Sequence, residues 1–251
     1  MNLVMKMNDL ELLNQYIHEA KHLIFFGGAG VSTASGLKDF RSADGLYHEK
    51  FLYSPEEVLS HTFFIENTAY FYQFYRKNLN SLSACPNICH QYLAKLEKEQ
   101  LLKAIITQNI DGLHQKAGSK KVIELHGTIM KNYCMNCGSS LSASEVFSAN
   151  GIPRCKCGGI IKPDVVLYEE ALDEEVIEEA IQEIEQADVL IVAGTSLVVY
   201  PASSFVRYFH GKHLIIINKD TTPMDGAADL VIHEDIKEVF QYLDQNRNTK
   251  K

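Results

Sequence analysis

The fold is decided by residues 23–41, which read Leu-Ile-Phe-Phe-Gly-Gly-Ala-Gly-Val-Ser-Thr-Ala-Ser-Gly-Leu-Lys-Asp-Phe-Arg. The first four residues are apolar and show no helical period, which indicates a short buried strand. Three glycines follow, Gly27, Gly28 and Gly30, and they allow the backbone to turn tightly and to approach a ligand closely. The stretch therefore predicts a strand that runs into a phosphate-binding loop.

The loop matches known phosphate-binding fingerprints only in part. Counted from Gly28, the dinucleotide fingerprint G-x-G-x-x-G requires glycine at Thr33, but the next glycine is Gly36, and no Gly-Lys-Ser or Gly-Lys-Thr of a P-loop is present. Ser32 and Thr33 are candidate caps of a following helix, whose first N–H groups and dipole would attract phosphate. The glycines alone leave two interpretations open, nucleotide binding and a merely tight strand-to-helix turn.

The end of the stretch adds an acid, an aromatic ring and a guanidinium. These groups suit the reactive end of a cofactor, and the alternative is an exposed turn with one buried ring. The whole stretch resembles the signature of the sirtuins, NAD-dependent protein lysine deacylases, in which Gly-Ala-Gly-x-Ser precedes Gly-x-x-Asp-Phe-Arg. Lys38 stands where that family usually has proline, which implies a freer cofactor loop. The resemblance implies these cofactor contacts: Gly28, Ala29, Gly30, Thr33, Asp39, Phe40 and Arg41.

Length and composition limit the class of protein. A chain of 251 residues with 46% apolar composition suffices for one large domain, or for one domain with a small insert. The net charge of −8 argues against nucleic-acid binding and indicates, weakly, a cationic partner. The sequence has no apolar run near the roughly 18 residues of a membrane span, and residues 1–10 lack the apolar core of a signal peptide. We therefore expect a cytoplasmic protein that binds no membrane; a monomer is compatible with the sequence.

Apolar runs alternate with helical segments along the chain, which is typical of a doubly wound parallel sheet. The expected strands are residues 23–26, 102–107, 122–125, 189–193, 214–217 and 230–232. The expected helices are residues 9–21, 88–98 and 173–186. Residues 62–82 are rich in aromatic side chains, and we expect most of these rings to pack a small helical lobe.

Four of the six cysteines lie in two close pairs, Cys134-Met-Asn-Cys137 and Cys155-Lys-Cys157. The second pair is one residue shorter than the usual C-x-x-C. A glycine follows each pair and allows the tight turn that points backbone amides at sulfur. Four thiolates in such turns form a closed tetrahedral site, so the sequence predicts a structural zinc ion that stabilises an insert.

Two polar motifs follow expected strands, where ligands of a parallel sheet bind. One is Thr-Gln-Asn-Ile-Asp-Gly-Leu-His from residue 107, and the other is a His-Gly pair at His126. Alone, the first would be a turn, and a single histidine among ten is by default structural. Both match sirtuin motifs, which implies that Asn109 and Asp111 hold nicotinamide and its ribose, beside Gln108 and Ile110. The same match makes His126 the general base for a ribose hydroxyl and Asn109 a second catalytic residue.

The resemblance continues to the end of the chain. In sirtuins the residues that match Val165 and Val166 pair with an extended acyl-lysine peptide, a form of β-augmentation. Glu169 stands where the family often has glycine. The resemblance implies further cofactor contacts at Gly194, Thr195, Ser196, Asn218, Lys219, Asp220 and Ile236.

The aromatic segment bears on which acyl group is removed. Sirtuins that prefer acidic acyl chains carry Tyr-x-x-Arg there, because a carboxylate in an apolar tunnel needs a charged partner. The matching positions are Tyr72 and Tyr75, and Arg76 lies about 100° further round the helix. We therefore expect Tyr72 and Tyr75 to contact a substrate with a neutral acyl group.

We expect a Rossmann-type parallel α/β fold with helices on both faces, within one sirtuin-type catalytic domain at 1–251. Residues 1–41, 84–130 and 163–245 form the NAD-binding lobe, whereas the helical insert 42–83 and the zinc-binding insert 131–162 form a smaller lobe. The resemblance, to the bacterial type with a four-cysteine zinc site, implies NAD-dependent deacetylation of acetylated-lysine proteins or peptides. The products are nicotinamide, O-acetyl-ADP-ribose and free lysine. The alternatives are an NAD-dependent ADP-ribosyltransferase and a non-catalytic, zinc-stabilised NAD-binding module.

Overall fold

Six parallel strands form the central sheet of the computed structural model, which describes residues 3–40 and 45–247. The strand order is β3-β2-β1-β7-β8-β9, and each neighbouring pair is parallel. This is the order of a Rossmann-type dinucleotide-binding sheet, as predicted. The strands are β1 (Leu23–Gly27), β2 (Leu102–Thr107), β3 (Val122–Glu124), β7 (Val189–Ala193), β8 (His213–Ile217) and β9 (Leu230–Ile232).

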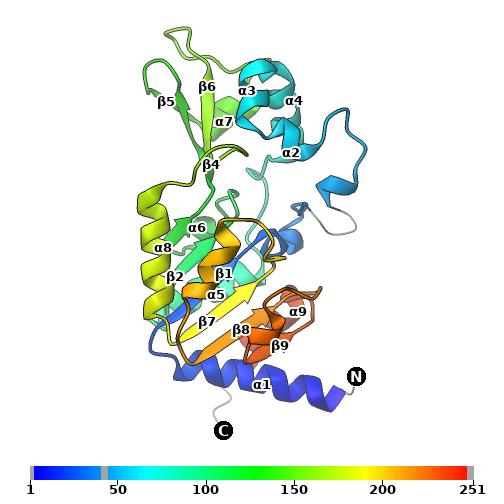
Figure 1. The fold of residues 1–251 in the computed structure, drawn as a ribbon, viewed down its shortest axis with the longest axis vertical. Coiled ribbons are helices and arrows are strands. Elements are labelled where there is room, and N and C mark those ends of the chain that lie inside the picture. The colour runs from blue at the N-terminus through cyan, green and yellow to red at the C-terminus, as the bar shows by residue number, and fades with distance from the viewer. Residues whose placement is uncertain (1–2, 41–44, 248–251) are drawn as a thin grey trace.

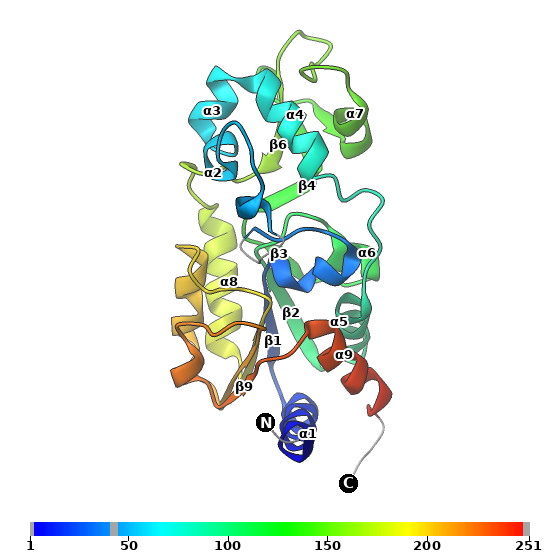
Figure 2. The same cartoon turned by 90° about the vertical axis from the view of Figure 1, so that its right-hand side faces the viewer.

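Helices cover both faces of this sheet, which explains why its strands are apolar at almost every position. In β1, Leu23 and Phe25 pack in one apolar layer, and Ile24 and Phe26 in the other. Figure 2 shows α5 and α9 on one side of the sheet and α8 on the other. The helices of this lobe are α1 (Leu3–Glu19), α5 (Ile88–Lys98), α6 (Leu113–Ala117), α8 (Glu174–Gln186), α9 (Ile236–Gln245) and the 3-10 helix Ala202–Tyr208.

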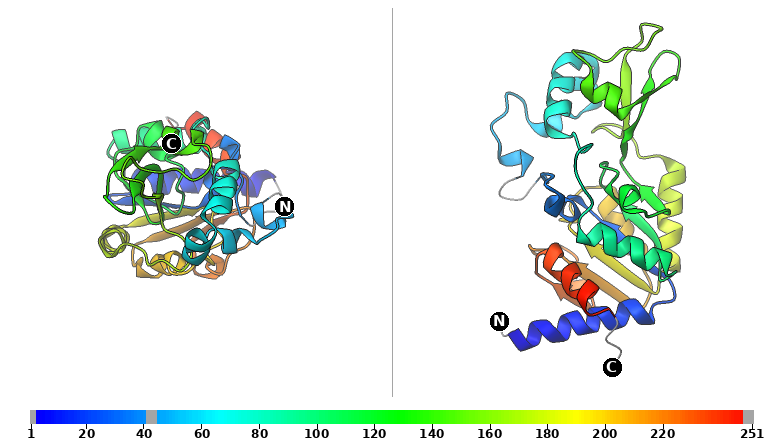
Figure 3. Two further views of the ribbon diagram at one scale, coloured as in Figure 1. Left: turned by 90° about the horizontal axis from the view of Figure 1, so that it is seen from above. Right: turned by 180° about the vertical axis from the view of Figure 1, so that it is seen from behind.

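A smaller lobe lies beyond one end of the sheet, opposite α1 (Figures 1 and 3). It combines a three-stranded antiparallel sheet, in the order β5-β4-β6, with four short helices. The predicted aromatic packing is present, because the rings of residues 63–75 join one apolar cluster with side chains of this sheet. The elements are α2 (Pro55–Val58), α3 (His61–Glu66), α4 (Thr68–Asn78), β4 (Gly127–Cys134), β5 (Ser140–Ser142), α7 (Ala143–Ser148) and β6 (Ile161–Val165).

The prediction of an α-helix directly after the glycine loop is wrong. Two 3-10 turns, Ala29–Val31 and Thr33–Ser35, follow β1, and neither has a side-chain cap. The Ser32 hydroxyl donates instead to Asp111, 2.6 Å away, and the Thr33 hydroxyl donates to the carbonyl of Gly30. The Ser32 hydroxyl, which the local sequence predicts to cap a helix, is therefore bonded to a residue far along the chain.

The sulfur atoms of the four paired cysteines meet at one end of the small sheet. The Sγ atoms of Cys134 and Cys157 lie 3.5 Å apart, those of Cys137 and Cys155 lie 3.7 Å apart, and all four fall within 4.8 Å of one another. Sulfurs at the corners of a tetrahedron, about 2.3 Å from zinc, would lie about 3.8 Å apart. The shortened second pair thus still fits the predicted closed zinc site.

Among the helices of residues 3–40 and 45–247, none combines the length and the apolar character that crossing a lipid bilayer requires.

Gly127 begins β4, ahead of the lobe boundary expected at residue 131. Its backbone has φ +68°, and an added Cβ would lie 2.0 Å from the carbonyl oxygen of Asp164 on the paired strand β6. Both the left-handed backbone and the close approach therefore require glycine at this position.

Gly127→Ala should lower the free energy of unfolding more than Gly151→Ala, which serves as its matched control. Gly151 has φ +77° with nothing within 4 Å, so alanine there should lose only the ~1–2 kcal/mol of a left-handed residue. The clash with β6 should remove a further ~1–3 kcal/mol in Gly127→Ala. Urea unfolding of both variants measures the difference, and equal losses would contradict the close approach.

Cys134→Ala should abolish zinc binding and unfold the segment between β4 and β6, because metal binding and local folding are one equilibrium. Elemental analysis should find one zinc per chain in the unchanged protein, and protease cleavage within residues 131–162 should report the unfolding. Cys85→Ala is the control, since Cys85 is exposed and lies outside the cluster. Folded protein that retains this segment without zinc would disprove the assignment.

Candidate active site

Two glycine loops meet at the centre of the sheet, where the strand order reverses between β1 and β7. The amide of Gly30 donates to the carbonyl of Gly194 at 2.9 Å, and a Cβ at Gly30 would lie 2.8 Å from the Cα of Gly194. A Cβ at Gly28 would lie 2.7 Å from the same carbonyl oxygen. The glycines are therefore needed where the two loops touch, at the switch point that binds ligands in open α/β sheets.

A cleft of about 950 Å³ opens above these loops, between the two lobes. Most of the predicted site residues line it, although they come from every part of the chain. Gly28 does not line the cleft, since it packs beneath Gly194 and Thr195, and Arg41 lies outside the described residues. The predicted residues on the cleft wall are Ala29, Gly30, Thr33, Asp39, Phe40, Tyr75, Gln108, Asn109, Ile110, Asp111, His126, Val165, Val166, Gly194, Thr195, Ser196, Asn218, Lys219, Asp220 and Ile236.

Asn109 and Asp111 are held by one chain of hydrogen bonds. The Asn109 side-chain amide donates to the Gly28 carbonyl and to the Ser32 hydroxyl, at 3.1 Å each. Ser32 donates in turn to the Asp111 carboxylate at 2.6 Å, and the amide of Leu113 donates to its other oxygen at 2.9 Å. Burial raises the pKa of Asp111 above its ordinary value, although both hydrogen bonds oppose this shift. The amide and the carboxyl group are thus fixed side by side.

The sequence did not reveal the residues that contact Ser32 from α5 and so support this chain of hydrogen bonds. The Asn87 amide donates to Nδ1 of His90 at 3.3 Å, so the proton of neutral His90 lies on Nε2, which faces Ser32 at 3.5 Å. Burial lowers the pKa of His90 to about 4, and burial and the neighbouring His90 lower that of His114 further below its ordinary value. The sequence carried one signal for His90, because Asn-x-x-His forms the capping box of α5.

His126 follows β3, with its ring on the cleft wall. Its Nδ1 lies 2.9 Å from the Gln108 carbonyl oxygen, which can only accept, so Nδ1 carries the proton. Nε2 therefore keeps a lone pair that can take a proton. Burial lowers the pKa of His126 below its ordinary value, and the bond to Gln108 opposes this shift. The imidazole is therefore neutral at neutral pH, as a general base requires.

The far end of the cleft lies at the ends of β8 and β9. The Asn218 amide donates to the Ile232 carbonyl at 3.1 Å, which joins the two strands where they end. Lys219 pairs with Asp235 at 2.8 Å, and Asp235 caps α9 in front of Ile236. The hydrogen bond from Lys219 lowers the pKa of Asp235 despite its partial burial. These groups form a polar rim around the apolar Ile236.

The loop after the second 3-10 turn brings Phe40 to the cleft, where its ring lies 5.6 Å from that of Tyr47. Lys38, which the resemblance associated with a freer loop, forms an ion pair with Glu49. The Tyr47 amide also donates to the Phe40 carbonyl at 3.0 Å. The loop thus has tethers that the sequence did not reveal.

Tyr72 is not on the cleft wall, which corrects its expected role. Its side chain is fully buried in the small lobe, where the hydroxyl donates to the Ile161 carbonyl. Tyr75, about one turn later, and Asn78, nearly two turns later, do line the cleft, and burial raises the pKa of Tyr75. The guanidinium of Arg76 lies over the Tyr72 ring, 5.4 Å from its centre. If Tyr75 takes the place of the tyrosine in Tyr-x-x-Arg, the position of the arginine is occupied by Asn78.

The comparisons with known proteins agree with this site. A model of the Sir2 family matches residues 28–201. An NAD-dependent protein deacetylase from Clostridium acetobutylicum is 54% identical over 245 residues, which cover 96% of this chain and 99% of that protein.

Two solved structures extend the likeness to the fold. A Sir2 structure with a deacetylated p53 peptide and 3′-O-acetyl-ADP-ribose has a TM-score of 0.86 and 36% identity, and covers 95% of this chain and 98% of its own. A Sir2 homologue in complex with NAD has a TM-score of 0.84 and 38% identity, with coverages of 94% and 93%. The chain belongs to the Sir2 family, the sirtuins.

Proposed function

We propose that this chain is an NAD-dependent protein lysine deacetylase. The observation that carries the proposal is the orientation of His126, whose protonated Nδ1 is bound to Gln108 and whose Nε2 is left as a base on the cleft wall. The related deacetylase and the Sir2 complexes with NAD and with a deacetylated peptide support this activity.

NAD, when bound, supplies an ADP-ribosyl group that is released from nicotinamide and accepts the acetyl group, leaving as O-acetyl-ADP-ribose. The amides of Gly28, Gly30 and Gly194 already donate within the protein, so the hydroxyls of Thr195 and Ser196, which line the cleft beside the glycine loops, would donate to its phosphates. Asn218 and Ile236 suit the adenosine end, with Lys219 and Asp220 on the rim. Asn109 and Asp111 suit the nicotinamide end, because their polar atoms are fixed by Ser32.

The chain's own contribution to the reaction is positioning and proton transfer. Phe40 lines the cleft, and its ring would exclude water from the ribose face of bound NAD. With NAD bound, His126 would accept a proton from a ribose hydroxyl and so make that oxygen a nucleophile toward the acyl group. Val165 and Val166 lie on the cleft wall, where an extended acetyl-lysine peptide can add beside them. Holding the acetyl-lysine and NAD in one cleft would allow the acetyl oxygen, a weak nucleophile, to attack the anomeric carbon of the ribose.

Mass analysis after incubation with NAD and an acetylated peptide tests the proposal against its alternatives. Deacetylation gives O-acetyl-ADP-ribose and a peptide that has lost one acetyl group. ADP-ribosyl transfer to a protein side chain instead gives a covalent adduct, and a non-catalytic NAD-binding module gives neither product. Either of the last two results would overturn the proposal.

His126→Ala should reduce turnover by about 10²–10⁴-fold, the usual loss on removal of a general base, while NAD binding persists. Steady-state kinetics and calorimetric titration with NAD measure the two quantities. His210→Ala removes an exposed imidazole that is not on the cleft wall and should leave both unchanged. A His126→Ala enzyme with near-normal turnover would remove this residue from the mechanism.

The same base should give kcat/KM an acid limb. The pKa of His126 lies below the 6.5 of a free imidazole, so the active, unprotonated form persists at neutral pH and is lost as the pH falls through that lower value. A pH profile of kcat/KM for the acetylated peptide measures the limb. A limb centred above pH 6.5 would contradict the burial effect.

The enzyme should favour acetyl-lysine over succinyl-lysine by more than about tenfold, or ~1.4 kcal/mol of transition-state binding. Asn78 stands beside Tyr75 on the cleft wall, so it offers no cation to a carboxylate. Comparing kcat/KM on one peptide that carries either group measures the preference. Equal or better desuccinylation would mean that another cation reaches the acyl group.

Asn78→Arg should narrow this preference by about tenfold, since it places a guanidinium beside the cleft tyrosine. Gln73→Arg adds the same charge on the exposed side of α4 and is the matched control. Equal effects of the two variants would show that general charge, and not placement, changes the preference.

A further inference from the structure

The segment that lines the cleft after β6, residues 165–170, is hydrogen-bonded on both flanks. On one flank, the Val166 amide donates to the carbonyl of His126 at 3.0 Å. On the other, the Tyr168 amide donates to the Leu59 carbonyl at 3.0 Å, and the Tyr168 carbonyl accepts from the His61 amide at 2.9 Å. The segment thus bridges the catalytic histidine and the start of α3.

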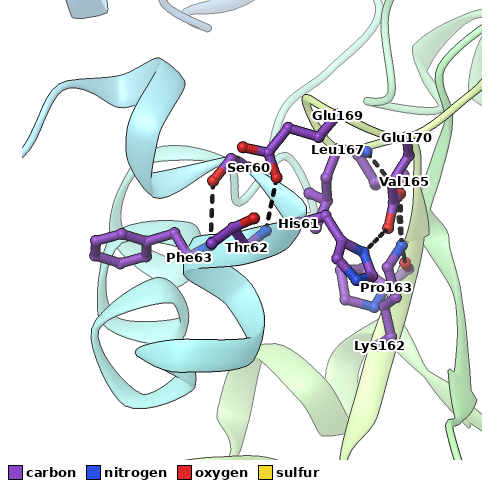
Figure 4. A network of polar contacts seen from close by, with 10 residues as sticks. All are labelled: Ser60, His61, Thr62, Phe63, Lys162, Pro163, Val165, Leu167, Glu169 and Glu170. Carbon is purple, nitrogen blue, oxygen red and sulfur yellow. Dashed lines mark hydrogen bonds and ion pairs between the residues drawn. The ribbon is translucent and has the colours of Figure 1, made fainter.

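The carboxylate of Glu170 joins three parts of the small lobe (Figure 4). It accepts from the Leu167 amide at 2.9 Å, from the ammonium of Lys162 at 3.0 Å and from Nδ1 of His61 at 2.9 Å. The Lys162 ammonium is buried and also donates to the Val165 carbonyl at 3.0 Å. Burial acts to raise the pKa of Glu170, but its hydrogen bonds outweigh burial and lower it, so the carboxyl group is charged at neutral pH.

Glu169 makes a second connection between this segment and α3, although its backbone conformation is unfavourable for a residue with a side chain. The Glu170 amide donates to the Leu167 carbonyl at 3.0 Å, which closes a turn, and Glu169 within it has φ +75°. Glycine suits that position, because a side chain disfavours the left-handed region. The Glu169 carboxylate nevertheless accepts from the Thr62 amide at 2.9 Å, in the first turn of α3 beside the cap Ser60 (Figure 4). The side chain thus satisfies an N–H group that the helix leaves without an internal partner.

We propose that Glu169 and Glu170, the acidic pair, are positioning residues for the acetyl-lysine peptide. Together they hold residues 165–168 against α3, so that the backbone edge which receives the peptide is in place before binding. The proposal rests on the proposed function, because it assigns this segment to the peptide. Without the acidic pair, residues 165–168 would have to become ordered when the peptide binds, and this loss of conformational entropy would weaken peptide affinity.

Glu169→Gly separates the two effects of this residue. Glycine removes the strain of the turn but also removes the bond to Thr62, so a side chain that is merely tolerated would leave peptide affinity unchanged or improved. We expect the dissociation constant and the KM of an extended acetylated peptide to rise by about three- to tenfold, the size of one typical net hydrogen bond. The kcat at saturating peptide and the KM for NAD should stay unchanged.

Three further variants sharpen the test. Glu170→Gln should raise the same two constants, since it removes the charge that Lys162 and His61 face. Glu169→Gln keeps an oxygen that can accept from Thr62 and should lose less affinity than Glu169→Gly. Glu66→Gln, a charge removal at an exposed position of α3, is the matched control and should lose none.

A doubly capped acetyl-lysine without flanking residues gives a readout that a general structural defect would not move. It cannot pair along residues 165–168, so Glu169→Gly should not change its kcat/KM. Equal losses for both substrates, or an unchanged peptide affinity in Glu169→Gly and Glu170→Gln, would overturn the proposal. Calorimetric titration keeps the two proposals apart: unchanged protein that binds the acetylated peptide without deacetylating it would refute only the function, and protein that binds no peptide would refute both.

Discussion

The contact between the glycine loops after β1 and β7 is the constraint on which the rest of the site depends. Gly30 donates to Gly194, and a Cβ on Gly28, Gly30 or Gly194 would lie within 2.9 Å of the opposite loop. The loops can therefore touch only if these positions carry no side chain. The contact lies at the switch point of the sheet, where the connections after the two neighbouring strands run to opposite faces. This contact sets the floor of the cleft, on which we propose that the phosphates of NAD lie.

Further hydrogen bonds then order the side chains to which we assign the chemistry. Ser32, on the first loop, accepts from Asn109 and donates to Asp111, while Gln108 holds the ring of His126. Each bond lies in a partly or fully buried place, where an unmet polar group is costly, so the arrangement is rigid before any ligand arrives. Asparagine, aspartate and histidine thus reach one cleft wall, each held by a bond to another residue.

The sequence predicted the elements that packing decides locally and failed where distant partners intervene. Strands β2, β7 and β9 and helix α5 have the predicted bounds, because unbroken apolar runs and a helical stripe leave one arrangement. The helix expected after Gly30 is absent from the described chain, because Asp111 binds the hydroxyl of Ser32. The motif resemblance implies that Tyr72 contacts the substrate, but a motif does not reveal which face of a helix meets the core, and Tyr72 is buried in the small lobe. No local pattern could have disclosed the bonds from Glu169 and Glu170 to α3.

His126 is hydrogen-bonded at two points, through its ring and through its backbone. Nδ1 is held by Gln108 of the large sheet, and the carbonyl is held by the Val166 amide after β6. The imidazole is therefore anchored both by its ring and by the main chain that carries it. A side chain anchored twice has few rotamers left to lose when a ligand arrives, so presenting its free Nε2 to the cleft costs little conformational entropy.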